Sequence, residues 1–170
     1  CAALGPALIP ALHKLKFGQS IRDVGPASHM KKSGTPTMGG IMMLCGLFAA
    51  MVIWNRFTPL TVIAFVLTFG HALIGFLDDY IKVVMKRNLG LTALQKFALQ
   101  LAAAVAFLTL MRYEGMLTPN LYIPFWNVTV DLPEWLYFVL AAFIIVGTVN
   151  AVNLTDGLDG LAASVTLPVM

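Results

Sequence analysis

Charged residues are scarce in this sequence, which limits the classes of protein that it can encode. Asp, Glu, Lys and Arg together make up 11% of the 170 residues, while 59% are hydrophobic and the mean hydropathy is +0.83. A soluble domain carries about 25% charged residues, so an ordinary water-soluble domain is excluded. The net charge of +3 does not indicate nucleic-acid binding, because the basic residues form short clusters between apolar stretches.

Several common site and targeting patterns are also absent from the sequence. The two cysteines, Cys1 and Cys45, share no metal or redox spacing, and the three histidines have no ligand spacing such as H-x-x-x-H. No secretory signal with a cleavage site can be recognised, so residues 1–12 are expected to be the end of a membrane span. The sequence has no initiating Met and stops inside an apolar stretch, which we interpret as part of a longer chain.

Apolar stretches long enough to cross a bilayer make up most of the sequence. A helical span needs about 20 mostly apolar residues. Pro59 and Pro133 lie near the starts of two such stretches, where a missing N–H costs little, and Asp131 is expected to help cap the second. The sequence therefore predicts an all-α fold, a polytopic transmembrane helix bundle that forms a single membrane domain. Its expected spans are residues 1–12, 37–54, 57–77, 91–111 and 133–152, with the start of another from about residue 158.

The basic residues are distributed unevenly between the connections. Nine of the eleven Lys and Arg residues fall in the loops 13–36 and 80–96. Because basic loops are retained in the cytoplasm, these two loops are expected to be cytoplasmic, and the segments 55–58 and 112–132 are expected to be external. The three tryptophans lie beside the expected outer ends of spans, where the membrane–water interface favours an amphipathic ring. The second external segment is expected to form a short hairpin around Asn127.

This topology brings acidic residues to the cytoplasmic face, where the basic loops lie. Asp78 and Asp79 follow one span, and the polar segment 153–159 follows another. Two adjacent carboxylates at a helix C-terminus oppose the helix dipole and each other, so a cation is expected nearby, either Lys82 or a divalent metal. The alternative is an ordinary polar helix end at the membrane surface.

Two further segments contain candidate ligand-binding residues. In NAVNLTDGLDGLA, residues 150–162, Asn150 and Asn153 share a helix face before a break that exposes backbone N–H groups. Alternatively, the aspartates of this segment form a capping box for the next helix, with Asp156 as the N-cap. The segment SHMKKSGTPTMGG, residues 28–40, is not a Walker A loop. Its glycines, hydroxyls and lysines suit either an anion or the anionic headgroups of lipids.

Together, the strings SHMKKSGTPTMGG, GFLDDYIKV and VNAVNLTDGLDGLA resemble the phospho-N-acetylmuramoyl-pentapeptide transferase family of bacterial membrane enzymes. The resemblance runs along essentially the whole sequence. It implies transfer of phospho-N-acetylmuramoyl-pentapeptide from its UDP-linked donor to undecaprenyl phosphate, with release of UMP and a requirement for Mg²⁺. It also implies a location in the bacterial cytoplasmic (inner) membrane with the active site facing the cytoplasm, and it is compatible with a homodimer.

The resemblance further implies roles for individual residues. Asp78, Asp79 and Asp156 are the expected catalytic residues, and Asp79 and Asn153 are the expected metal ligands. The family places another essential Asp and a His-rich loop in a C-terminal half that this chain lacks, so the 170-residue chain alone is expected to be inactive. The expected substrate-binding residues are Lys32, Thr37, Lys82, Lys96, Asn153, Gly157, Leu158 and Asp159, with Lys86 as an additional candidate.

The sequence leaves two alternative functions open. A related polyprenyl-phosphate transferase would accept UDP-GlcNAc as its donor. A transporter or channel would also carry acidic residues on broken helices, but those acids are expected near the bilayer midplane rather than at the span ends.

Overall fold

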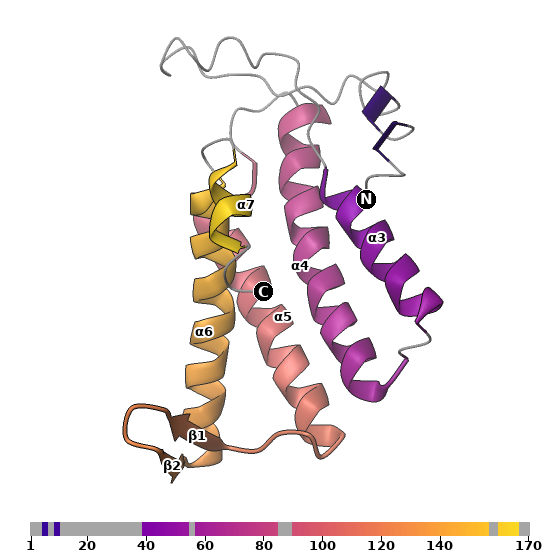
Figure 1. Ribbon diagram of the computed structural model, residues 1–170. Helices are drawn as coiled ribbons and strands as arrows, with labels where there is room; N and C mark the ends of the chain where they lie inside the picture. Colours follow the sequence, from indigo (N-terminus) through magenta and orange to yellow (C-terminus); the bar gives the residue numbers. More distant parts are fainter. Residues whose placement is uncertain are drawn as a thin grey trace. The chain divides into compact units, whose positions relative to one another are not determined.

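The computed structural model describes residues 5–6, 9–10, 39–54, 57–84, 90–156 and 160–166. Most of these residues are helical (Figure 1), which confirms the predicted all-α class. The chain divides into two compact units, residues 1–99 and 100–170, and each is described by itself. The elements are α3 (Gly40–Ile53), α4 (Pro59–Val84), α5 (Ala93–Tyr113), β1 (Asn120–Ile123), β2 (Val128–Asp131), α6 (Glu134–Thr155) and α7 (Leu161–Thr166).

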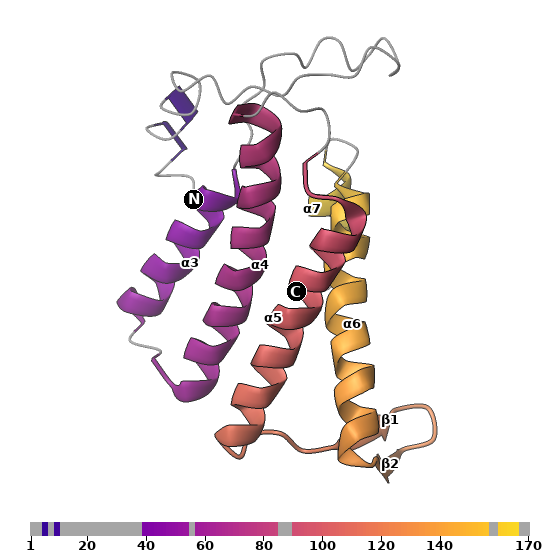
Figure 2. The same cartoon turned by 180° about the vertical axis from the view of Figure 1, so that it is seen from behind.

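In the first unit, α3 and α4 lie side by side and run in opposite directions (Figures 1 and 2). The start of α4 has a side-chain cap, because the Thr58 hydroxyl accepts a hydrogen bond from the N–H of Thr61 at 3.3 Å. Pro59 occupies the first helical position, where it displaces no intrahelical hydrogen bond. The helix continues to Val84, seven residues beyond the predicted end of this span at Leu77.

Three of the described helices, α4, α5 and α6, are long and apolar enough to cross a membrane. The helix in the stretch 37–54 is shorter, with 14 residues in α3. Many large apolar side chains on these helices are exposed, among them Phe69 on α4 and Phe143 on α6. Lipid rather than water is the solvent that suits such surfaces. We conclude that the chain belongs to a multi-pass membrane protein.

The second unit contains the hairpin that the sequence predicts around Asn127. Strands β1 and β2 pair antiparallel, with Asn120 opposite Asp131 and Ile123 opposite Val128. Asn127 lies in the turn with φ of +50°, a conformation that asparagine tolerates better than most residues. Its side-chain oxygen accepts a hydrogen bond of 2.8 Å from the Tyr122 hydroxyl.

The predicted cap of α6 by Asp131 is wrong. Asp131 is the last residue of β2 and pairs with Asn120. The N-cap residue of α6 is Pro133, and no side chain caps it. Asp131 is still part of the strand, two residues before the N-cap position, so its carboxylate does not serve as the N-cap.

Small and aliphatic side chains form the contact between α5 and α6 within the second unit. Ala104 and Leu108 on α5 are buried against Ala142 and Val146 on α6. Ala104 is 0% exposed, so it lies entirely inside this contact. The short helix α7 lies beside the last turns of α6 (Figure 2).

Candidate functional site

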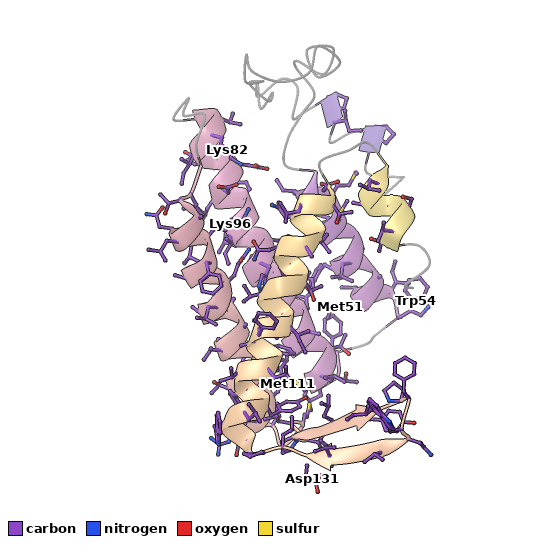
Figure 3. All side chains as sticks on the ribbon, turned by 90° about the vertical axis from the view of Figure 1, so that its left-hand side faces the viewer. Met51, Trp54, Lys82, Lys96, Met111 and Asp131 are labelled. Carbon is purple, nitrogen blue, oxygen red and sulfur yellow. The ribbon has the colours of Figure 1, made fainter. Side chains whose placement is uncertain are left out.

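Among the described residues of the first unit, several polar ones gather where the last turns of α4 meet the beginning of α5. We call this group the Asp78 cluster; it comprises Asp78, Asp79 and Lys82 of α4, the backbone N–H of Leu91, and Lys96 of α5. Figure 3 shows Lys82 and Lys96 on these two neighbouring segments. Because α4 continues to Val84, the two aspartates lie inside the helix rather than after its end.

Each oxygen of the Asp78 carboxylate has its own partner. Oδ1 accepts a hydrogen bond of 2.8 Å from the N–H of Leu91. Oδ2 accepts a hydrogen bond of 2.6 Å from Nζ of Lys82, one helical turn further along α4. Nζ of Lys96 lies 3.9 Å from the same oxygen. The cation that the sequence predicts beside the two acids is therefore present, and a second lysine from α5 adds to it.

Burial distinguishes the two adjacent aspartates. The Asp78 side chain is 9% exposed, whereas that of Asp79 is 36% exposed. A buried carboxylate is costly unless it is paired and hydrogen-bonded, and the partners of Asp78 meet that requirement. Asp79 lies with Oδ1 3.9 Å from Nζ of Lys82. Its carboxylate is thus the more accessible of the two to a ligand.

A capping box fixes the beginning of α5 next to this cluster. The N–H of Thr92 donates to Oε1 of Gln95 at 3.0 Å, and the N–H of Gln95 donates to Oγ1 of Thr92 at 3.2 Å. This reciprocal pair satisfies two N–H groups that a helix start otherwise leaves open. The Leu91 N–H just before it is directed at Asp78 instead. This capping box was not predicted from the sequence, although T-x-x-Q is a recognisable capping pattern.

The second unit contains a buried polar pair near the last turns of α6. Nδ2 of Asn150 donates to Oε1 of Gln100 at 2.7 Å and to the carbonyl oxygen of Val146 at 2.8 Å. Gln100 is 1% exposed. Asn150 is therefore committed to holding α6 against α5, and Asn153, one turn later, is the exposed asparagine of the two. The role of Gln100 was also missed, although a glutamine within an apolar span is itself a signal.

Asp156 is the C-cap residue of α6, and its own N–H donates to the carbonyl oxygen of Val152 at 3.0 Å. The next helix, α7, begins only at Leu161. The capping-box interpretation of this segment, which requires Asp156 at the N-cap of the following helix, is therefore wrong. Asp156 is exposed, and the catalytic role that the resemblance implies for it stays a prediction.

The remaining predicted site residues divide between the units or lie outside the described residues. Asp78, Asp79, Lys82 and Lys96 belong to the first unit, and Asn153 and Asp156 belong to the second. The predicted roles of all these residues stay predictions. Outside the described residues lie Lys32, Thr37, Lys86, Gly157, Leu158 and Asp159.

Comparison with known proteins identifies a matching family and several similar proteins. The sequence profile of glycosyl transferase family 4 matches residues 60–170. The phospho-N-acetylmuramoyl-pentapeptide-transferase of Bacillus cytotoxicus is 56% identical over 164 residues, which cover 94% of this chain and 50% of that protein. The proteins of the same name from Bacillus subtilis and Bacillus velezensis are 51% and 52% identical over 162 residues, which cover 93% of this chain and 49% of each relative. The chain thus spans about half the length of the curated relatives that it matches.

Proposed function

The chain belongs to glycosyl transferase family 4, and from that premise we propose that the full-length protein transfers phospho-N-acetylmuramoyl-pentapeptide from its UDP-linked donor to undecaprenyl phosphate. In this reaction the sugar-bearing phosphoryl group passes to the lipid phosphate, UMP leaves, and the first lipid intermediate of peptidoglycan synthesis forms. The names of relatives at 51–56% identity support this choice of substrates. The observation that carries the proposal is the Asp78 cluster near the end of a span-capable helix.

The chemistry of the two substrates explains why such a cluster suits the reaction. Both the nucleotide donor and the lipid acceptor are anionic, so their phosphates repel each other unless positive charge lies between them. Lys82 and Lys96 supply two ammonium groups that Asp78 holds close to one another. We propose that these lysines bind the substrate phosphates, while Asp79, the more exposed acid, faces the reacting groups.

Magnesium is part of the proposal, and the donor atoms available are compatible with it. Among the described residues, no group of three His, Cys, Asp or Glu side chains is placed to hold a metal ion. However, Mg²⁺ is commonly bound by only one or two protein carboxylates together with substrate phosphates. We propose the carboxylate of Asp79 and the amide oxygen of Asn153 as its protein ligands. Bound magnesium would neutralise charge on the phosphate oxygens.

We also propose that the site faces the cytoplasm of a bacterial cell at its inner membrane. The support is the distribution of basic residues, because nine of eleven Lys and Arg residues fall in the loops 13–36 and 80–96. A soluble nucleotide and a membrane-embedded lipid phosphate can meet only at a membrane surface. A transporter is disfavoured because the charged residues of α4, α5 and α6 lie near the helix ends rather than at mid-span.

The test is radiolabelled transfer by the full-length protein in detergent micelles, with undecaprenyl phosphate as acceptor. We expect UDP-N-acetylmuramoyl-pentapeptide to serve as donor and UDP-GlcNAc to fail. Asp78→Asn and Asp79→Asn are each expected to lower kcat by about 100-fold or more. The first removes the charge that holds Lys82 and Lys96 together, and the second removes the acid proposed to face the reacting groups. Asp131→Asn is the matched control, since Asp131 is an exposed acid of the hairpin. Full activity in both Asp78→Asn and Asp79→Asn would show that the site is assigned wrongly.

A further inference from the structure

A glycine with no assigned function, Gly90, lies against Asp78. A Cβ atom added at Gly90 would lie 2.8 Å from the carbonyl oxygen of Asp78 and 2.9 Å from its Cγ, and closer still to Oδ1. Carbon atoms do not approach these groups so closely without a shift of the chain. Since one of the contacts is the backbone of α4, a side-chain rotation alone cannot relieve it. Only glycine fits at this position without displacing the turn.

This close approach is what allows the next residue to reach the carboxylate. The N–H of Leu91 donates to Oδ1 of Asp78 at 2.8 Å across a separation of 13 residues. Without it, Oδ1 would lose the hydrogen bond from Leu91 in a side chain that is only 9% exposed. A buried carboxylate oxygen that lacks a donor is strongly unfavourable. The turn at Gly90 and Leu91 therefore decides how the Asp78 side chain is oriented.

The same turn also sets the position of Lys96. The hydrogen bonds of the Thr92–Gln95 capping box join the turn to the first residues of α5. Lys96 lies one helical turn after Thr92, with Nζ 3.9 Å from Oδ2 of Asp78. A displacement of Gly90 from α4 would thus move both a donor to Oδ1 and a cation near Oδ2.

We propose that Gly90 is a positioning residue for the transfer reaction, which holds the Leu91 N–H and Lys96 against Asp78. This inference rests on the proposed function, but it concerns a residue that has no predicted role in that function. Gly90 acts through Asp78 and Lys96 and contacts no substrate. Because Gly90 has no side chain, the turn before α5 can lie directly against Asp78 of α4.

The test compares Gly90→Ala with Gly75→Ala in the full-length protein. Gly75 lies in α4, one turn before Asp78, and an added Cβ there meets nothing within 4 Å. We expect Gly90→Ala to lower kcat by about 10- to 100-fold, the size of effect that a small misplacement of catalytic groups produces. The KM for the UDP-linked donor should rise as well, because Lys96 is one of the proposed phosphate-binding lysines, and Gly75→Ala should match the unsubstituted protein. A kcat for Gly90→Ala equal to that of Gly75→Ala would overturn the proposal.

Hydrogen exchange of the Leu91 amide supplies a measurement that does not depend on the reaction. Gly90→Ala is expected to speed this exchange by about tenfold or more, as loss of a hydrogen bond to a charged acceptor implies. Asp78→Ala should speed it as well, because it removes the acceptor without introducing a clash, so this variant decides the matter if Gly90→Ala does not fold. Unchanged exchange in Asp78→Ala would refute the inference. If exchange responds while the unsubstituted protein transfers no phosphosugar, the proposed function fails and the contact between Gly90, Leu91 and Asp78 stands.

Discussion

The hydrogen bond between Gln100 and Asn150 gives a prediction whose magnitude follows from the structure. Asn150 donates through Nδ2 to two acceptors, Oε1 of Gln100 at 2.7 Å and the carbonyl oxygen of Val146 at 2.8 Å. Gln100→Met removes the first acceptor but keeps the length of the side chain and leaves the second acceptor in place. Hydrogen bonds between membrane helices contribute about 0.6 kcal/mol on average and about 1.7 kcal/mol at most. Because Gln100 is 1% exposed, we expect a value in the upper half of this range.

A double-mutant cycle isolates this contribution. The free energy of unfolding would be measured in mixed micelles by titration with a denaturing detergent, using the full-length protein and the variants Gln100→Met, Asn150→Ala and both together. We expect a coupling energy of about 1–1.7 kcal/mol. The control cycle pairs Asn150→Ala with Thr109→Val, since the Thr109 hydroxyl donates to the carbonyl oxygen of Val105 in its own helix. A Gln100–Asn150 coupling within about 0.3–0.5 kcal/mol of zero, the scatter of independent sites, would refute the reasoning.

Three further substitutions test other parts of the second unit by the thermal unfolding midpoint of the full-length protein. Leu108→Ala should lower the free energy of unfolding by about 2 kcal/mol, at the low end for such substitutions because lipid rather than water surrounds the contact. Leu108 is 3% exposed in the α5–α6 contact, so an unchanged Tm would contradict this packing. Asn127→Val should lower the free energy of unfolding by about 1–2 kcal/mol because a β-branched residue resists positive φ, and Asn127→Gly should lower it less. A larger decrease in Tm for Asn127→Gly than for Asn127→Val would argue against the turn. Arg112→Gln should leave Tm nearly unchanged, because its ion pair with Glu134 is exposed, and a large decrease would show that the pair is more than a surface contact.

The predicted elements and the observed ones agree where a single local signal decides the structure. The long apolar stretches became α4, α5 and α6, because a backbone in lipid must satisfy its hydrogen bonds within a helix. The hairpin formed around Asn127, the residue in its turn that adopts positive φ. The predicted end of α4 was seven residues too early, because the first charged residue was taken as the end of the span. In the structure the charges of Asp78 and Lys82 satisfy each other within the helix, so they do not end it.

The contacts that build the Asp78 cluster were only partly predictable from the sequence. The pairing of Asp78 with Lys82 follows from their spacing of one helical turn. The approach of Leu91 does not, because it depends on how the chain returns from α4 to α5 and on the space that Gly90 leaves. The partner of Asn150 is 50 residues away in sequence, and no local pattern indicates it. Long-range contacts of this kind need the packed helices to be known first.

The complete burial of Ala104 between α5 and α6 has a thermodynamic consequence. In a bilayer these two helices separate into acyl chains, so their separation exposes no apolar surface to water. The positive heat-capacity change that accompanies melting of a water-soluble core should therefore be nearly absent from this step. Chilling weakens an ordinary protein core but should leave the α5–α6 contact intact.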